Sequence, residues 1–284
     1  MPRSRPGAGD RIVDAAVARL HEQGVTVALD GISLEEAIAA SGVSRATAYR
    51  RWPNRAEFLR EVLVRVVRAA RLEPEGSDEL EAIRTLVQEQ RDQLGTETGR
   101  RTLAVESLRI AADSDYRRLA TSREWRNYLA LRATCDGLPD SELRDTVTAE
   151  LRAAERAFAR HRASVYAQLP QLLGYRLVPP LTGEFGFTVM AETMGALITG
   201  LVVRAAIGEE TPPFRARGFG SSVESEWTTA SYSLVAALLT YLEPDPTVEW
   251  DEERITASIA RFGELEDVIE ASRMAAGLTG RGAE

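Results

Sequence analysis

The stretch SLEEAIAASGVSRATAYRRWPNRAEFL, residues 33–59, decides the fold of this chain, because it predicts three short helices separated by two breaks. Ser33 begins the first helix as its N-cap, and Glu36, three residues further on, completes a capping box. Gly42 ends this helix, because glycine tolerates the positive φ angle of a tight exit.

The second and third helices are marked by similar signals. Ser44 caps the second helix at 45–51, and Pro53 ends it, because the residue before a proline is pushed out of the helical region. Asn54 caps the third helix, with Glu57 three residues further on. Two helices joined by a short turn containing glycine form a helix-turn-helix, so the stretch predicts this motif with a third helix behind it.

The second helix carries side chains that suit DNA. Within seven residues it has Arg45, Thr47, Tyr49, Arg50 and Arg51. Arginine can bond guanine edges, threonine can contact the thymine methyl group, and tyrosine and arginine can bind phosphates. Small alanines at 46 and 48 favour a close approach to base edges. The alternative is a small helical subdomain with a solvated arginine face.

From about Asp10 to Val67 the chain resembles the DNA-binding domain of the TetR family of transcriptional regulators. The resemblance covers RIVDAAVARLHEQG, SLEEAIAASGVS and TAYRRWPNRAEFL. In the last block the family usually has Thr-Leu-Tyr, two polar residues, Phe, Pro, Ser-Lys-Glu and Leu. Trp52 replaces the usual Phe, and Arg55 replaces the Lys. The loop between Gly24 and Ser33 is longer than is usual in the family.

The resemblance implies roles for individual residues. Phosphate contacts fall on Ser33, Thr47, Tyr49 and Arg55, and base contacts fall on Arg45, Ala46 and Arg50. The N-terminus of the third helix, at Asn54, also suits a phosphate. The complete candidate DNA-binding set is Ser33, Ser44, Arg45, Ala46, Thr47, Tyr49, Arg50, Arg51, Asn54 and Arg55.

Charge is distributed unevenly along the 284 residues. Residues 1–71 contain 12 arginines and 8 acidic residues, whereas residues 72–284 contain 23 arginines and 35 acidic residues. A basic head on an acidic body fits a head that binds DNA and a body that does not. We therefore expect a DNA-binding domain at 1–72 and a second domain at 73–284.

Several kinds of chemistry find no support in the sequence. All 35 basic residues are arginines, so there is no lysine for a Walker-A motif or a Schiff base. Cys135 has no partner for an intramolecular disulfide, and His21 and His161 lie far apart without cysteine partners. We expect no cofactor, no metal and no enzymatic activity. The first residues, MPRSRPGAG, have no apolar core typical of a signal peptide, which favours a cytoplasmic location.

The body is expected to be helical throughout, which makes the whole chain all-α. Hydrophobic periodicity and helix-breaking residues predict helices at about 77–94, 98–112, 115–134, 140–173, 184–207 and 222–242. A boundary with the head is expected at Pro74-Glu75-Gly76. The tail after Pro244 has a weaker helical pattern.

The stretch FGFTVMAETMGALITGLVV, residues 185–203, contains one charge. Its length permits a membrane span, but Glu192 near its middle and the absence of a basic flank argue against one. A helix that is apolar all round is buried in a core or in a subunit interface. The helices at 184–207 and 222–242 resemble the pair through which TetR-like proteins form a homodimer, and Gly195 and Gly200 would allow close helix packing.

A small-molecule effector site must touch both the dimer helices and the helices leading to the head, because binding otherwise has no effect on head spacing. This reasoning selects Arg109, Trp125, Tyr128, Phe158, His161, Val165, Gln168 and Met190 as candidate ligand-binding residues. The alternatives are an Arg109 paired with Glu106 and a His161 that is a hydrogen-bonded core residue.

Together these observations predict a homodimeric, TetR-like regulator of transcription. We expect it to act as a repressor that a small molecule releases from a palindromic site on double-stranded DNA. Two alternatives remain. One is a constitutive dimeric DNA-binding protein without an effector, and the other is a helical enzyme or adaptor with a vestigial DNA-binding head.

Overall fold

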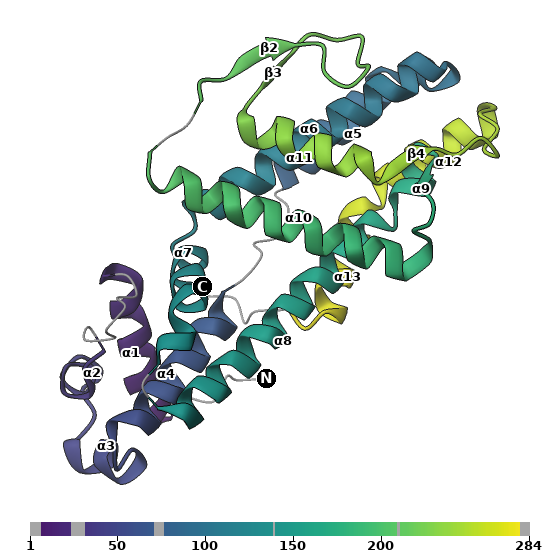
Figure 1. Ribbon diagram of the computed structural model, residues 1–284. Helices are drawn as coiled ribbons and strands as arrows, with labels where there is room; N and C mark the ends of the chain where they lie inside the picture. The colour runs from purple at the N-terminus through teal and green to yellow at the C-terminus, as the bar shows by residue number, and fades with distance from the viewer. Residues whose placement is uncertain (1–6, 24–31, 71–76, 139, 209–210, 279–284) are drawn as a thin grey trace. The chain divides into compact units, whose positions relative to one another are not determined.

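The computed structural model describes residues 7–23, 32–70, 77–138, 140–208 and 211–278 (Figure 1). The chain is mostly helical, as predicted, and divides into two compact units. Of the described residues, 7–23, 32–70, 122–138 and 140–156 belong to the first unit, and 77–121, 157–208 and 211–278 belong to the second. The long loop predicted before Ser33 and the boundary predicted at 74–76 lie outside the described residues.

The first unit begins with α1 (Ala8–Gln23), α2 (Leu34–Ser41), α3 (Arg45–Arg51) and α4 (Arg55–Ala69). Helix α1 contacts the other three. The core between them is apolar and closed to water, with Ile12, Val13, Phe58, Val62 and Leu63 all 0% exposed. On α4 the buried residues Phe58, Val62 and Val66 recur every four positions, so this helix turns one apolar face inward.

Residues 122–156 also belong to the first unit, whereas the sequence analysis assigned them to the body. They form α7 (Arg123–Thr134), a 3-10 turn η2 (Cys135–Gly137) and the first part of α8 (Ser141–Tyr166). Helix α7 packs against α1 and α4, where the Asn127 amide donates to the Leu20 carbonyl at 3.3 Å. Arg68 of α4 bonds Glu150 of α8 at 2.6 Å. The unit that contains α1–α4 therefore also includes α7 and the first part of α8.

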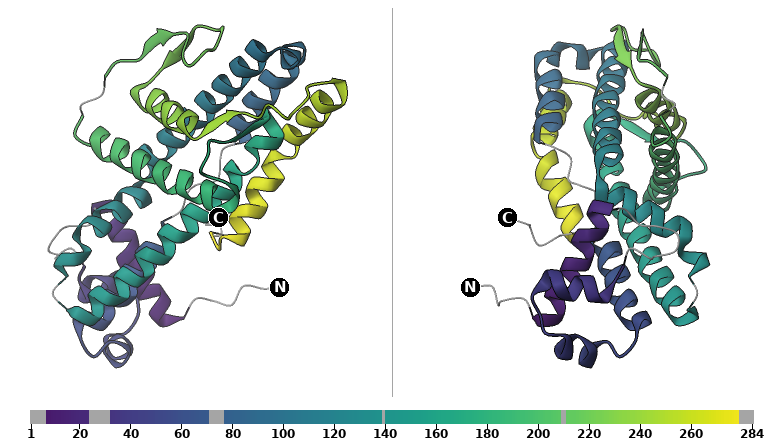
Figure 2. Two further views of the ribbon diagram at one scale, coloured as in Figure 1. Left: turned by 45° about the vertical axis from the view of Figure 1, so that its right-hand side comes forward. Right: turned by 90° about the vertical axis from the view of Figure 1, so that its left-hand side faces the viewer.

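The second unit is built around α6 (Glu97–Thr121), which contacts α5 (Ser77–Glu89), η1 (Arg91–Gly95), α10 (Gly183–Ala205) and α11 (Thr229–Thr240). Helices α10 and α11 lie side by side (Figure 2). The other helical segments described in this unit are the end of α8, α9 (Leu169–Leu173), α12 (Glu252–Gly263) and α13 (Leu265–Ala275). The weak helical pattern of the tail is thus confirmed.

Short strands occur in this unit as two antiparallel pairs, which the all-helical prediction did not include. Strand β1 (Tyr175–Leu177) pairs with β4 (Leu242–Pro244), placing Tyr175 opposite Pro244. Strand β2 (Phe214–Ala216) pairs with β3 (Ser225–Trp227), placing Phe214 opposite Trp227. The predicted helix at 222–242 is therefore wrong in its first part. Helix α11 starts only after Thr228, which forms a capping box with Ser231.

Two further predicted boundaries are wrong. The break expected between 112 and 115 does not occur, and α6 continues to Thr121. The break lies at Ser122, whose hydroxyl caps α7 by accepting from the Trp125 backbone N–H at 3.1 Å. The helix predicted at 140–173 ends at Tyr166 and is followed by the separate short helix α9.

Candidate nucleic-acid interface

Helices α2 and α3 are joined by a three-residue turn whose geometry follows from local signals. Gly42 adopts φ 65° and ends α2 in the left-handed conformation. The Ser44 hydroxyl then caps α3 by accepting from the Thr47 backbone N–H at 3.3 Å. Ser33 caps α2 and Asn54 caps α4 in the same way. The three predicted N-caps are confirmed, because capping depends only on residues a few positions apart.

One face of α3 is exposed and the other is buried. Arg45, Ala46, Tyr49 and Arg50 are exposed, and Tyr49 keeps 47% of its surface accessible. Ala48 is 0% exposed, so its small size serves packing inside the unit rather than access to base edges. The idea that both small alanines face DNA is therefore wrong for Ala48. The exposed face presents two cations and a phenol to solvent.

Arg51 and Trp52 close the other end of α3. The Arg51 guanidinium bonds the Glu61 carboxylate at 2.8 Å and lies 5.3 Å from the centre of the Trp52 ring. The Trp52 indole N–H donates to the same carboxylate at 2.9 Å. The hydrogen bond that the guanidinium donates to Glu61 raises the pKa of Arg51. Arg51 thus ties α3 to α4, a structural contact that the sequence reasoning did not anticipate.

Sequence reasoning also missed Glu35, which lies beside the predicted phosphate contacts. Its carboxylate accepts a hydrogen bond from the Tyr49 hydroxyl at 2.8 Å and another from the Ser33 hydroxyl at 3.3 Å. The Tyr49 bond is the main cause that lowers the pKa of Glu35, and the same bond raises the pKa of Tyr49. Glu35 and Tyr49 are fourteen residues apart in the chain, so the turn between α2 and α3 creates this contact.

The remaining predicted DNA-binding residues divide between caps and surface. Thr47 is half-buried, and its hydroxyl lies 2.9 Å from the Ser44 hydroxyl. The Asn54 amide oxygen accepts from the Glu57 backbone N–H at 3.0 Å, which leaves this side chain occupied as a cap. Arg55 is exposed in the first turn of α4.

The predicted effector residues belong to both units. Trp125 and Tyr128 are part of the first unit, where their rings stack at 5.1 Å and the Tyr128 hydroxyl donates to Glu155 at 2.5 Å. Burial is the main cause that raises the pKa of Tyr128. The other six residues belong to the second unit and are Arg109, Phe158, His161, Val165, Gln168 and Met190.

The polar members of that six have partners within their own unit. Arg109 bonds Glu106 at 2.8 Å, and Glu106 also accepts hydrogen bonds from two serine hydroxyls of the 221–225 segment. His161 is 4% exposed, and its Nδ1 lies 3.0 Å from the Ser272 hydroxyl. Burial lowers the pKa of His161 to about 4. The alternatives of a paired Arg109 and a hydrogen-bonded core histidine are confirmed. Gln168 accepts from Arg261 at 2.6 Å.

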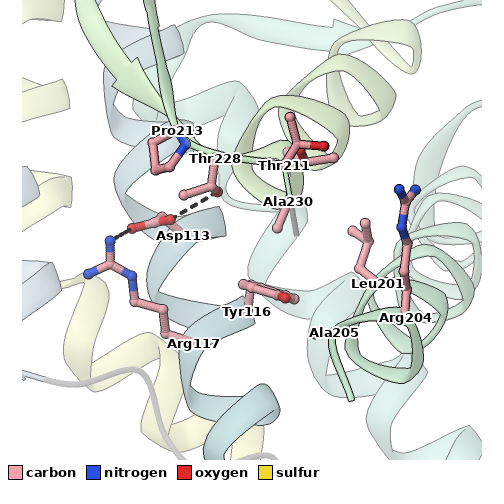
Figure 3. A pocket seen from close by; sticks show the side chains of 11 residues that line it. Asp113, Tyr116, Arg117, Leu201, Arg204, Ala205, Thr211, Pro213, Thr228 and Ala230 are labelled. Carbon is pink, nitrogen blue, oxygen red and sulfur yellow. Dashed lines mark hydrogen bonds and ion pairs between the residues drawn. The ribbon is translucent and has the colours of Figure 1, made fainter. Parts of the chain in front are cut away.

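A cavity of about 180 Å³ lies in the second unit between α6, α10 and the start of α11 (Figure 3). Asp113 forms its polar side, bonding Arg117 at 2.6 Å and accepting from the Thr228 hydroxyl at 3.2 Å. The lining contains none of the eight predicted effector residues. It consists of Asp113, Tyr116, Arg117, Leu201, Arg204, Ala205, Thr211, Pro213, Thr228, Thr229 and Ala230.

Helix α10 has an inner and an outer apolar face. Its inner face, with Met190, Met194 and Ile198 at 2% exposure or less, packs against α6 and α11. Its outer face leaves Phe185 71% exposed and Val203 54% exposed. Within the described ranges, α10 is the one helix long and apolar enough to cross a membrane, and 39% of that apolar window is buried in the fold.

Among the residues that the structure describes, no group of three or more His, Cys, Asp or Glu side chains is placed to hold a metal ion. Comparisons with models of known protein families, with curated proteins and with solved structures find no match to the chain.

Proposed function

We propose that this protein is a TetR-like transcriptional regulator that binds double-stranded DNA through α3. The observation that carries the proposal is the exposed face of α3, where Arg45, Tyr49 and Arg50 point away from a core sealed by Ala48. Helix α2 and the turn at Gly42 complete a helix-turn-helix, in which the second helix enters the major groove. Two arginines on that helix supply the groups that most often read guanine.

In this proposal the protein acts as a homodimer that pairs through α10 and α11. The outer face of α10 carries exposed apolar groups at Phe185 and Val203, with small residues Ala196 and Gly200 between them. A side chain at Gly200 would meet no atom within 4 Å, so this position is open to a second helix. An apolar face rimmed by polar groups marks an interaction surface. Glu192 on this face favours a protein partner over lipid.

A small molecule is proposed to release the DNA. The cavity beside Asp113 is the place in the second unit that suits it, because its walls come from α6 and from both helices of the proposed dimer interface. A ligand there would bear on α10 and α11, whose pairing sets the distance between the two heads. Repression relieved by this ligand is the expected mode of regulation.

The experiment that tests the proposal is selection of binding sites by the full chain from a pool of random duplexes. We expect an enriched palindrome with half-sites about one helical turn, or roughly 34–36 Å, apart. The double variant Arg45→Ala, Arg50→Ala should lose the enrichment. A matched control, Arg152→Ala with Arg156→Ala, removes two exposed arginines of α8 and should keep it. Selection that enriches no sequence, or equal enrichment by both double variants, would overturn the assignment.

A further inference from the structure

The Glu35 carboxylate lies on the surface that the proposed function assigns to the DNA backbone. Its two oxygens accept separately, one from Tyr49 at 2.8 Å and the other from Ser33 at 3.3 Å. These hydroxyls come from different helices, Ser33 from the N-cap of α2 and Tyr49 from the outer face of α3. Both are the donors expected to meet phosphate, so a single acid holds two groups that DNA would need.

A carboxylate and a phosphodiester make similar demands on such donors. Each presents two anionic oxygens that accept charge-assisted hydrogen bonds. Glu35 also lies in the first turn of α2, where the positive end of the helix dipole favours an anion. The site occupied by Glu35 in the free protein is therefore chemically a site for a DNA phosphate.

We propose that Glu35 is an internal competitor for DNA phosphate, which occupies the Ser33 and Tyr49 hydroxyls until the DNA backbone displaces it. This inference rests on the proposed DNA-binding function and names a residue that limits its affinity. Displacement moves a negative charge away from two donors and leaves it close to the phosphates. The free energy needed to displace Glu35 lowers the affinity for every duplex equally, because phosphates carry no sequence information.

The consequence for binding is opposite to that expected for an ordinary contact residue. Removing the acid frees both hydroxyls and abolishes its repulsion of the backbone. Glu35→Gln and Glu35→Ala should each tighten binding of a random-sequence duplex by roughly fivefold to tenfold, the effect of one unit charge at a few ångströms in water. The gain should be equal on the duplex selected by the protein and on the random one.

The neighbouring acid provides a matched control. Glu36 is also exposed in the first turn of α2, but its carboxylate pairs with Arg19 at 3.1 Å and not with a hydroxyl of α3. Glu36→Gln changes the net charge of the protein by the same amount as Glu35→Gln. Its effect on affinity should be at most about twofold at moderate salt, where exposed charges are screened.

A double-mutant cycle distinguishes competition from positioning. In the wild-type protein Tyr49→Phe should change affinity by less than about twofold, because the hydroxyl must first leave Glu35. In the Glu35→Ala background the same change should weaken binding severalfold. If Glu35 instead holds Tyr49 ready for phosphate, Glu35→Ala weakens binding, and the effect of Tyr49→Phe disappears in its presence.

The measurement is fluorescence anisotropy of a labelled random duplex titrated with full-length protein, with a thermal melt of each variant to confirm folding. Tighter binding by both Glu35 variants and not by Glu36→Gln supports the competitor role. Unchanged or weaker binding by both Glu35 variants, with wild-type protein that binds DNA, overturns this inference alone. A wild-type protein that does not bind duplex DNA overturns the proposed function and this inference with it.

Discussion

Helices α3 and α10 both present an exposed face, but the two faces differ in chemistry. The outer face of α3 carries Arg45, Tyr49 and Arg50, whereas the outer face of α10 carries Phe185 and Val203. Charged groups are well solvated in the free protein, so α3 is stable without a partner. Exposed apolar surface costs about 25 cal/mol per Å², so α10 gains from being covered at all times.

The difference separates two kinds of partner. A charged face that water solvates suits a ligand that binds and leaves, and its affinity depends on salt. An apolar face of small and large side chains suits a permanent partner of the same kind, such as a second copy of the chain. We therefore expect DNA to be the reversible partner and the homodimer to be the permanent one.

The largest effect is expected from a charge placed on the outer face of α10. Ala196→Arg introduces an unpaired cation into the proposed interface, which costs about 3–5 kcal/mol when buried without a partner. Sedimentation velocity should show a monomer or an aggregate in place of a dimer. The same substitution at Ala271, an exposed residue of α13, is the matched control and should leave the dimer intact.

A stable dimer of Ala196→Arg would place the interface elsewhere. Leu238 of α11 is a poorer choice for this test, because it is 5% exposed within its own unit and an arginine there would disrupt folding. Gly195 is also unsuitable, since a side chain there would meet Arg162 of the same unit at 3.4 Å. Only a residue on the outer face distinguishes assembly from folding.

The interior of the second unit predicts the next largest effect, which depends on pH. Burial lowers the pKa of His161 to about 4 from an ordinary value of 6.5, so the folded protein resists the proton that the unfolded chain accepts. The titration of His161 leaves the free energy of unfolding unchanged above pH 6.5 and lowers it as the pH drops from 6.5 to 4. The loss should reach about 3 kcal/mol. It is measured by urea unfolding across this range.

Two variants show whether His161 causes that loss. His161→Asn removes the titrating group, so the decline between pH 6.5 and 4 should become shallower by the same amount. Ser272→Ala removes the hydroxyl 3.0 Å from Nδ1 but keeps the imidazole, so stability should fall at all pH values while the slope persists. Equal slopes for wild type and His161→Asn would show that other groups control acid unfolding.

Residues that act locally could be predicted from the sequence, and residues that act across the fold could not. Ser33, Ser44 and Asn54 were predicted as caps because a cap bonds a backbone N–H three residues away. Ser122 caps α7 in the same way, so the α6–α7 break is also set by a local contact. Strand β3 offered no comparable local signal, because its partner β2 lies across a loop.

The candidate sites divide in the same way. Ala48 marks the buried face of α3, the helix that Ser44 caps. Sequence periodicity is therefore sufficient to predict which arginines of α3 are exposed. The contact between Glu35 and Tyr49 depends on the angle between two helices, which sequence spacing does not encode. The predicted effector set follows from order along the chain, whereas the cavity beside Asp113 combines α6 with α10 and the start of α11, which are distant from α6 in sequence.

Base-reading arginines should give a moderate and sequence-dependent effect. Arg45→Ala and Arg50→Ala are each expected to cost about 1–3 kcal/mol on the selected duplex and to relax preference at one base position. Arg51→Ala is the matched neighbour, because Arg51 bonds Glu61. Arg51→Ala should lower the melting temperature of the protein and leave its base preference nearly unchanged. The readouts are anisotropy titrations against single-base variants of the duplex and thermal melts.

The smallest effect is expected at Arg55 of α4, which we expect to contact only the DNA backbone. Arg55 lies exposed in the first turn of α4, beside the cap Asn54, so its guanidinium is expected to reach a phosphate rather than a base. Arg55→Ala should weaken binding to selected and random duplexes equally, by roughly 0.5–1.5 kcal/mol. It should also reduce the slope of log affinity against log salt by about 1, because one fewer phosphate is neutralised and one fewer counterion is released. Titrations at several salt concentrations measure both quantities.

An unequal loss on the two duplexes would give Arg55 a share in base reading, whereas an unchanged salt slope would remove it from the interface.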